Sequence, residues 1–167
     1  MLRTGRSLTH AAPHRWLIAL CVLGLWFAAP VRAQTNDVAV VVHPDVPIDN
    51  LTLGELRRIV LGDRGFWPAS VRVTLLLRAP VAHERDVILK TVCQMTEAQF
   101  RQHWIAKVFR ADTAVTPKIV YSSEMSVDMV IRIPGAITFV DASRVGRNLK
   151  VLKIDGLAPS DKGYVLR

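Results

Sequence analysis

The chain has few cysteines, which limits the disulfide bonds that it can form. Cysteine occurs twice in 167 residues, at Cys21 and Cys93. Because Cys21 falls within an N-terminal apolar run, Cys93 stands alone in the rest of the chain, which excludes an internal disulfide there. We interpret Cys93 as a small buried apolar residue rather than a reactive thiol.

Motifs for enzymatic chemistry are missing as well. The sequence holds no Gly-x-Ser-x-Gly elbow, no glycine-rich phosphate loop that ends in Lys-Ser/Thr, and no paired-cysteine motif. His43, His83 and His103 lie far apart, and none stands at metal-ligand spacing from a cysteine or a carboxylate. We therefore expect a protein that is not an enzyme, with no catalytic residue, no metal site and no cofactor.

An apolar run near the start of the chain has the pattern of a secretory leader. Three arginines precede an uncharged stretch over residues 16–29, and Val31-Arg32-Ala33 then offers small residues where signal peptidases cleave. The run is shorter than the ~20 residues of a membrane span. We predict a signal peptide over residues 1–33, cleaved after Ala33, and a periplasmic location. An uncleaved N-terminal anchor is the alternative.

Charge narrows the choice of partner. The whole chain carries 22 basic and 14 acidic residues, a formal charge of +8, but four arginines belong to the predicted leader. The 134 residues that follow carry +4, and their basic side chains are scattered without interleaved aromatics. This balance in an exported protein argues against nucleic acid as a partner. It is compatible with a small anion or an acidic protein.

Apolar patterning over residues 34–167 alternates between strands and helices. Four apolar segments predict strands at 38–42, 71–77, 136–140 and 149–154, the first buried on both faces. Helices are predicted at 52–61, at 84–92, from a capping box at 96–99 onward, and at 123–131. Phe100, Trp104 and Val108 predict a core stripe on the third helix. This order predicts one α/β domain with a mixed or largely parallel sheet flanked by helices.

The junction between the second strand and the second helix is the best candidate for a ligand site. Arg78 ends the strand, and unpaired N–H groups at the following helix start attract anions. We take Arg78 as an anion contact, with His83 and Arg85 as helpers. The alternative is that Arg78 pairs with Glu84 or a helix end. Residues 122–124, Ser-Ser-Glu, are interpreted as an N-cap cluster, with an anion contact as the alternative.

Four segments with matching order and spacing resemble a known family. They are 40–44 (VVVHP) leading into 51–59 (LTLGELRRI), 61–67 (LGDRGFW), 134–140 (PGAITFV) and 152–160 (LKIDGLAPS). Together they resemble the type 2 periplasmic solute-binding proteins, specifically the phosphate-binding component of phosphate ABC transporters. The resemblance covers the second lobe of these two-lobed receptors and implies a periplasmic-binding-protein-like single lobe. It also implies a phosphate-like anion as ligand and an ABC transporter or periplasmic protein as partner.

The family's anion contacts correspond only in part. Its second lobe holds phosphate with an arginine at a strand end, which corresponds to Arg78, and with a Gly-Ser-Gly-Thr turn. That turn corresponds to residues 81–84, Val-Ala-His-Glu, which lack both hydroxyls and both glycines. Two lost donors at ~1.5–3 kcal/mol each predict much weaker phosphate binding.

Two functions therefore stand as hypotheses. The first is an exported binding module for phosphate or another oxyanion that acts with a transporter. The second is a periplasmic adaptor or sensory domain that has lost its ligand and contacts a protein. A homodimer that rebuilds a two-lobed cleft is a further hypothesis.

Overall fold

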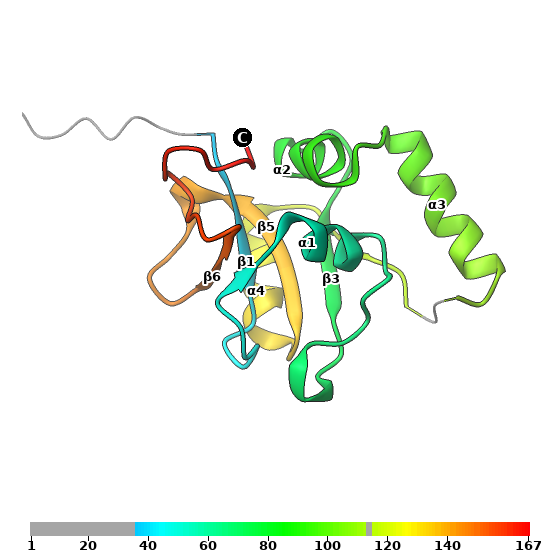
Figure 1. Cartoon of the computed structure of the whole chain (residues 1–167), viewed down its shortest axis with the longest axis horizontal. Coiled ribbons are helices and arrows are strands. Elements are labelled where there is room, and N and C mark those ends of the chain that lie inside the picture. Colours follow the sequence, from blue (N-terminus) through cyan, green and yellow to red (C-terminus); the bar gives the residue numbers. More distant parts are fainter. Residues whose placement is uncertain (1–35, 113–114) are drawn as a thin grey trace, which may run out of the picture. The chain divides into compact units, whose positions relative to one another are not determined.

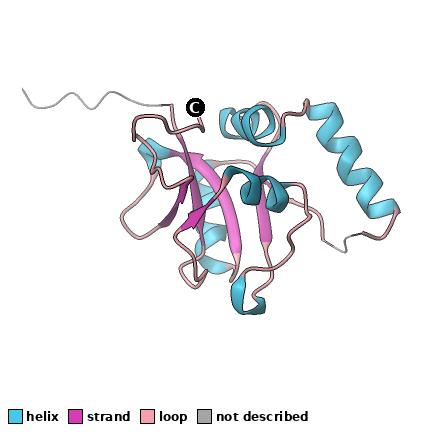
Figure 2. Ribbon diagram, in the orientation of Figure 1, coloured by secondary structure: helices cyan, strands magenta, loops and turns pink. Residues whose placement is uncertain are grey.

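The computed structural model describes residues 36–112 and 115–167, so the predicted leader lies outside the described residues. Within them, a six-stranded sheet has the order β2-β6-β1-β5-β3-β4 (Figure 1). The strands are β1 (Val38–Val42), β2 (Asn50–Leu51), β3 (Thr74–Arg78), β4 (Lys118–Val120), β5 (Ala136–Asp141) and β6 (Lys150–Ile154). Helices flank the sheet (Figure 2), which confirms the predicted α/β class.

The sheet is mixed. β1 lies antiparallel to both β5 and β6, whereas β3 lies parallel to β5 and to β4. Every residue of β1 is buried, as its uninterrupted apolar sequence predicts. β3 begins at Thr74 rather than at residue 71, because Arg72 forms an isolated bridge with Phe66 and the Val71 carbonyl accepts a hydrogen bond from the Trp67 N–H.

The helices follow the predicted order. They are α1 (Leu53–Val60), α2 (His83–Val87) continued by the π-helix η2 (Ile88–Cys93), α3 (Glu97–Phe109) and α4 (Ser123–Arg132), with the 3₁₀ turns η1 (Pro68–Ser70) and η3 (Ala142–Arg144). Both predicted capping boxes are present, with Thr52 and Glu55 at α1 and Thr96 and Gln99 at α3. Among the described residues, no helix is long and apolar enough to cross a membrane.

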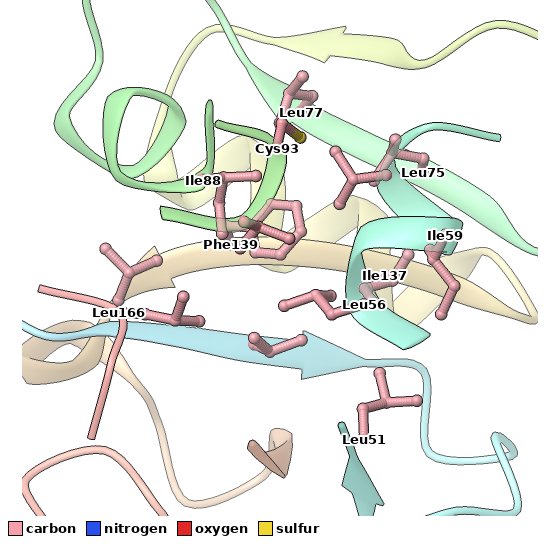
Figure 3. Packing of buried hydrophobic residues seen from close by; sticks show 14 of the residues in the cluster. Leu51, Leu56, Ile59, Leu75, Leu77, Ile88, Cys93, Ile137, Phe139 and Leu166 are labelled. Carbon is pink, nitrogen blue, oxygen red and sulfur yellow. The ribbon is translucent and has the colours of Figure 1, made fainter. Parts of the chain in front are cut away.

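Two apolar clusters cover the two faces of the sheet. The larger cluster joins one face to α1, α2, η2 and the first half of α3, and Phe139 lies in it near Leu56 and Ile88 (Figure 3). The smaller cluster joins the other face to α4 through Val130. Cys93 is fully buried in the larger cluster, and this burial raises the pKa of its thiol to about 11. The interpretation of Cys93 as a core residue is confirmed.

The core stripe predicted on α3 is correct for two residues and wrong for the third. Phe100 and Trp104 are buried, but the side chain of Val108 is 49% exposed. The physical reason is the path of α3, whose second half extends away from the sheet (Figure 1). Val108 therefore stays about half exposed.

Candidate functional site

Arg78 ends β3, at the edge of the sheet where α2 and α4 begin. Its side chain is 15% exposed, and its Nε lies 3.6 Å from the Glu84 carboxylate. Nε and Nη1 are both enclosed, and neither has a hydrogen-bond partner among the described residues. The pairing with Glu84 that the sequence left as an alternative is therefore present, as an ion pair without a hydrogen bond.

Glu84 is a buried acidic residue in the first turn of α2. A second group contacts its carboxylate, because the Ser123 hydroxyl donates to Oε1 at 3.3 Å. Ser123 is also buried and is the first residue of α4. A glutamate is seldom buried unless it is paired. Here Glu84 joins the end of β3 to the start of α4 and supplies a negative charge to Arg78.

Arg85 is buried beside Glu84 but contacts a different set of groups. Its guanidinium donates to both carboxylate oxygens of Glu97, at 2.7 and 2.8 Å, and to the Arg78 carbonyl at 2.8 Å. It also lies over the Phe100 ring. The hydrogen bonds from Arg85 are the main reason that the pKa of Glu97 is held below its usual range. Arg85 thus ties α2 to the start of α3.

His83 lies apart from the two arginines. Its side chain is exposed, and its Nε2 is 3.2 Å from the Asn36 carbonyl oxygen, just before β1. The structure therefore brings the side chains of Arg78, Glu84 and Ser123 together, while the Arg85 guanidinium contacts the Arg78 carbonyl and Glu97, and His83 contacts Asn36. The role of Arg78, His83 and Arg85 as anion contacts stays a prediction.

The start of α4 adds a further carboxylate near this cluster. Ser122 caps the helix, since its hydroxyl accepts from the Met125 N–H at 3.0 Å, as predicted. Glu124 is the second residue of α4. Hydrogen bonds at the helix start lower the pKa of Glu124, and the charges of Arg144 and Arg78 lower it by smaller amounts. The positive charge of Arg78 is thus offset by one buried carboxylate and one exposed carboxylate.

Sequence reasoning did not identify the contact between Ser123 and Glu84. The two residues are 39 positions apart, and no sequence pattern around either residue indicates the contact. The sequence signal was the acid at position 84, where the turn of the resembled family has a threonine. No group of three or more His, Cys, Asp or Glu side chains in residues 36–112 and 115–167 could hold a metal ion.

Comparison with known proteins gives structural neighbours only. No protein-family model and no curated protein matches the sequence. Among solved structures, an ABC-type phosphate transport receptor from Vibrio cholerae superimposes with a TM-score of 0.60 at 19% identity over 74% of this chain and 48% of the receptor. PstS from Borrelia burgdorferi gives 0.62 at 14% identity over 78% of this chain and 53% of PstS.

A third neighbour was solved with bound phosphate. This Clostridium perfringens protein, described as a phosphate ABC transporter substrate-binding protein, gives a TM-score of 0.59 at 19% identity over 72% of this chain and 46% of its own. The present chain thus spans about half the length of these structures. At such low identity the likeness establishes only that this chain shares its mixed α/β fold with about half of each of these structures.

Proposed function

We propose that this chain is an exported, periplasmic lobe of the solute-binding-protein type that acts as an adaptor for a protein partner instead of capturing free phosphate. The observation that carries the proposal is the position of Glu84. Its buried carboxylate lies 3.6 Å from Arg78 and accepts the Ser123 hydroxyl. The chain itself therefore provides the negative charge that an oxyanion would bring to Arg78.

The energetic consequence for a free anion is large. A phosphate on the Arg78 guanidinium would lie roughly 4 Å from the Glu84 carboxylate, because both would contact the same group. Two like charges at that distance repel by about 4 kcal/mol at an effective dielectric constant of about 20. This repulsion corresponds to a loss of affinity of about a thousandfold. Arg85 offers no compensation, since Glu97 and the Arg78 carbonyl already accept from it.

One observation favours a second function, the binding of phosphate or another oxyanion in partnership with an ABC transporter. Nε and Nη1 of Arg78 are enclosed without a hydrogen-bond partner among the described residues. A buried donor without a partner costs stability, and an oxyanion that displaced Glu84 would accept from both. The solved neighbour with bound phosphate supports this alternative.

Isothermal titration separates the two functions. Protein purified from the periplasm of an expressing bacterium is titrated with phosphate, sulfate and molybdate at low salt. The adaptor proposal expects no saturable heat for the wild type and weak phosphate binding by Glu84→Gln, which frees Arg78 of the negative charge. Binding should be absent from the Glu84→Gln, Arg78→Ala double variant. The matched control is Asp112→Asn, which removes an exposed carboxylate whose ion-pair partner is Arg110.

Two results would contradict the adaptor proposal. Saturable binding by the wild type that is lost in Arg78→Ala would establish the oxyanion receptor instead. If a folded Glu84→Gln variant gave no binding heat with any of the three anions, Glu84 would not be the group that excludes the ligand. Circular dichroism of each variant establishes that it is folded.

The domain assignment is part of the same proposal. We propose that residues 1–33 are removed on export and that residues 34–167 form the mature α/β lobe. N-terminal sequencing of the periplasmic protein should then begin at Gln34. Recovery of the full-length chain with the membrane fraction would support the retained anchor.

A further inference from the structure

An apolar groove lies between α3 and the segment that leads into β4. Its volume is about 390 Å³, and its lining is almost entirely hydrophobic. The side chains that matter here are Phe100, Trp104, Ile105, Val108, Phe109 and Ile119. Phe109 is 85% exposed, and Ile105, Val108 and Ile119 are also exposed. Apolar side chains gathered in one exposed concave site mark an interaction surface more often than isolated ones do.

The helix that forms this groove is firmly attached to the rest of the domain. The Lys107 ammonium, which is buried, pairs with Asp63 at 2.6 Å and donates to the Gly62 carbonyl at 3.2 Å. Nε2 of His103 lies 2.9 Å from the Leu61 carbonyl oxygen. At the other end, Glu97 receives both hydrogen bonds from Arg85. The exposed apolar face of α3 is therefore held in place by contacts near both ends of the helix.

The second wall of the groove belongs to the edge of the sheet. β4 is the last strand in the strand order and pairs with β3. Ile119, at the centre of β4, contributes to the groove. An edge strand leaves one row of backbone N–H and C=O groups available for pairing with a peptide. The groove thus lies beside an edge strand of the sheet.

Charge around the groove selects the kind of partner. Arg101 lines the groove, and its side chain is exposed. It forms no salt bridge among the described residues, whereas Glu97 pairs with Arg85, which also lines the groove. The rim therefore has a net positive charge. Two copies of this groove facing each other would bring like charges together, so the rim favours an acidic partner over a second copy.

We propose that the groove between α3 and β4 binds a segment of a periplasmic protein in which apolar anchor residues are flanked by Asp and Glu. This inference rests on the adaptor function proposed above and names the partner's chemistry. The anchors fill the space beside Val108 and Phe109. A flanking acid meets Arg101.

Selection from a library of short random peptides displayed on phage tests this chemistry without a known partner. The target is the exported full chain. The expected consensus has two or three apolar residues flanked by Asp or Glu, and a fluorescent peptide of that consensus should bind saturably in solution. Val108→Asp should weaken this binding by about tenfold or more, the effect of losing a central apolar anchor.

The matched control is Ile131→Asp on α4, because Ile131 has a similar exposure, 44%, and lies outside the groove. This variant should bind the peptide as the wild type does. Arg101→Glu should reverse the preference from acidic to basic flanks.

Three outcomes would overturn the inference. They are the absence of any selected consensus, a consensus with basic flanks, and peptide binding that Val108→Asp leaves unchanged. Sedimentation equilibrium adds a fourth, since self-association of the wild type that Val108→Asp abolishes would assign the groove to a second copy. The proposal for the groove and the proposed adaptor function can be refuted separately. Phosphate binding in the titration would refute the adaptor function without altering the peptide result.

Discussion

The ion pair between Arg85 and Glu97 provides the sharpest test of how the helices around the candidate site are held. We consider Glu97→Gln, which keeps the shape of the side chain and removes its charge. In the wild type both carboxylate oxygens accept from the buried Arg85 guanidinium, at 2.7 and 2.8 Å. The glutamine keeps one acceptor oxygen and turns an NH₂ group toward a second N–H, so one charge-assisted hydrogen bond is lost.

The size of the effect follows from that geometry. A hydrogen bond to a charged group contributes ~1.5–3 kcal/mol, but the Glu97 side chain is 37% exposed and solvent reduces its share. We expect the free energy of unfolding at pH 7 to fall by about 1–2 kcal/mol. The measurement is urea unfolding followed by circular dichroism. The control Asp128→Asn removes an exposed pair with Arg132 and should change stability by less than about 0.5 kcal/mol.

The pH dependence of stability is a second test of the Arg85–Glu97 ion pair. The folded state holds the pKa of Glu97 below its usual value, chiefly through the hydrogen bonds from Arg85. The contribution of the pair is therefore complete above the unfolded pKa of about 4.3 and is lost as the pH falls through the folded pKa. The gap between wild type and Glu97→Gln should accordingly close in acid. A gap that is absent at pH 7, or that persists unchanged in acid, would refute the assignment.

Three further predictions concern the core. Gly135→Ala should destabilise the fold by roughly 2 kcal/mol or more in urea unfolding, because Gly135 has φ +72° and an added Cβ would lie 2.1 Å from the Arg72 carbonyl oxygen. Trp67→Phe should cost about 1–2 kcal/mol in the same assay, since it removes the buried 2.8 Å bond from Nε1 to the Gly135 carbonyl. The thiol of Cys93, whose pKa burial raises to about 11, should resist a thiol-specific reagent at pH 8 in the folded protein and react in urea.

The sequence predicted those elements whose signal is local. The capping boxes at Thr52 and Thr96 both form, and the uninterrupted apolar run of β1 is buried throughout. β2 and β4 were missed because they have only two and three residues, too few for a periodic pattern. The antiparallel pairing of β1 with β5 was also beyond reach, since alternation of strands and helices does not determine the direction of each neighbour.

The sequence predicted the position of the candidate site along the chain but not the contacts around it. Arg78 at a strand end and a helix starting nearby are sequence features, and both are present. The hydrogen bond from Ser123 to the buried Glu84 forms because α4 packs beside β3. The exposure of Val108 likewise depends on where α3 points, which helical spacing does not specify.

The first turn of α2 explains why we place the function elsewhere on the surface. Glu84 and Arg85 are consecutive and carry opposite charges. Both contact the end of β3, and Glu84 also contacts the start of α4, whereas Arg85 contacts the start of α3. An anion site at this turn would need the same charges that now join three elements. We therefore expect the two variants to change different properties. Glu84→Gln removes the negative charge beside Arg78 and affects anion binding, whereas Val108→Asp changes the groove and affects peptide binding. A variant of one kind that altered both anion and peptide binding would show that the two surfaces form one site.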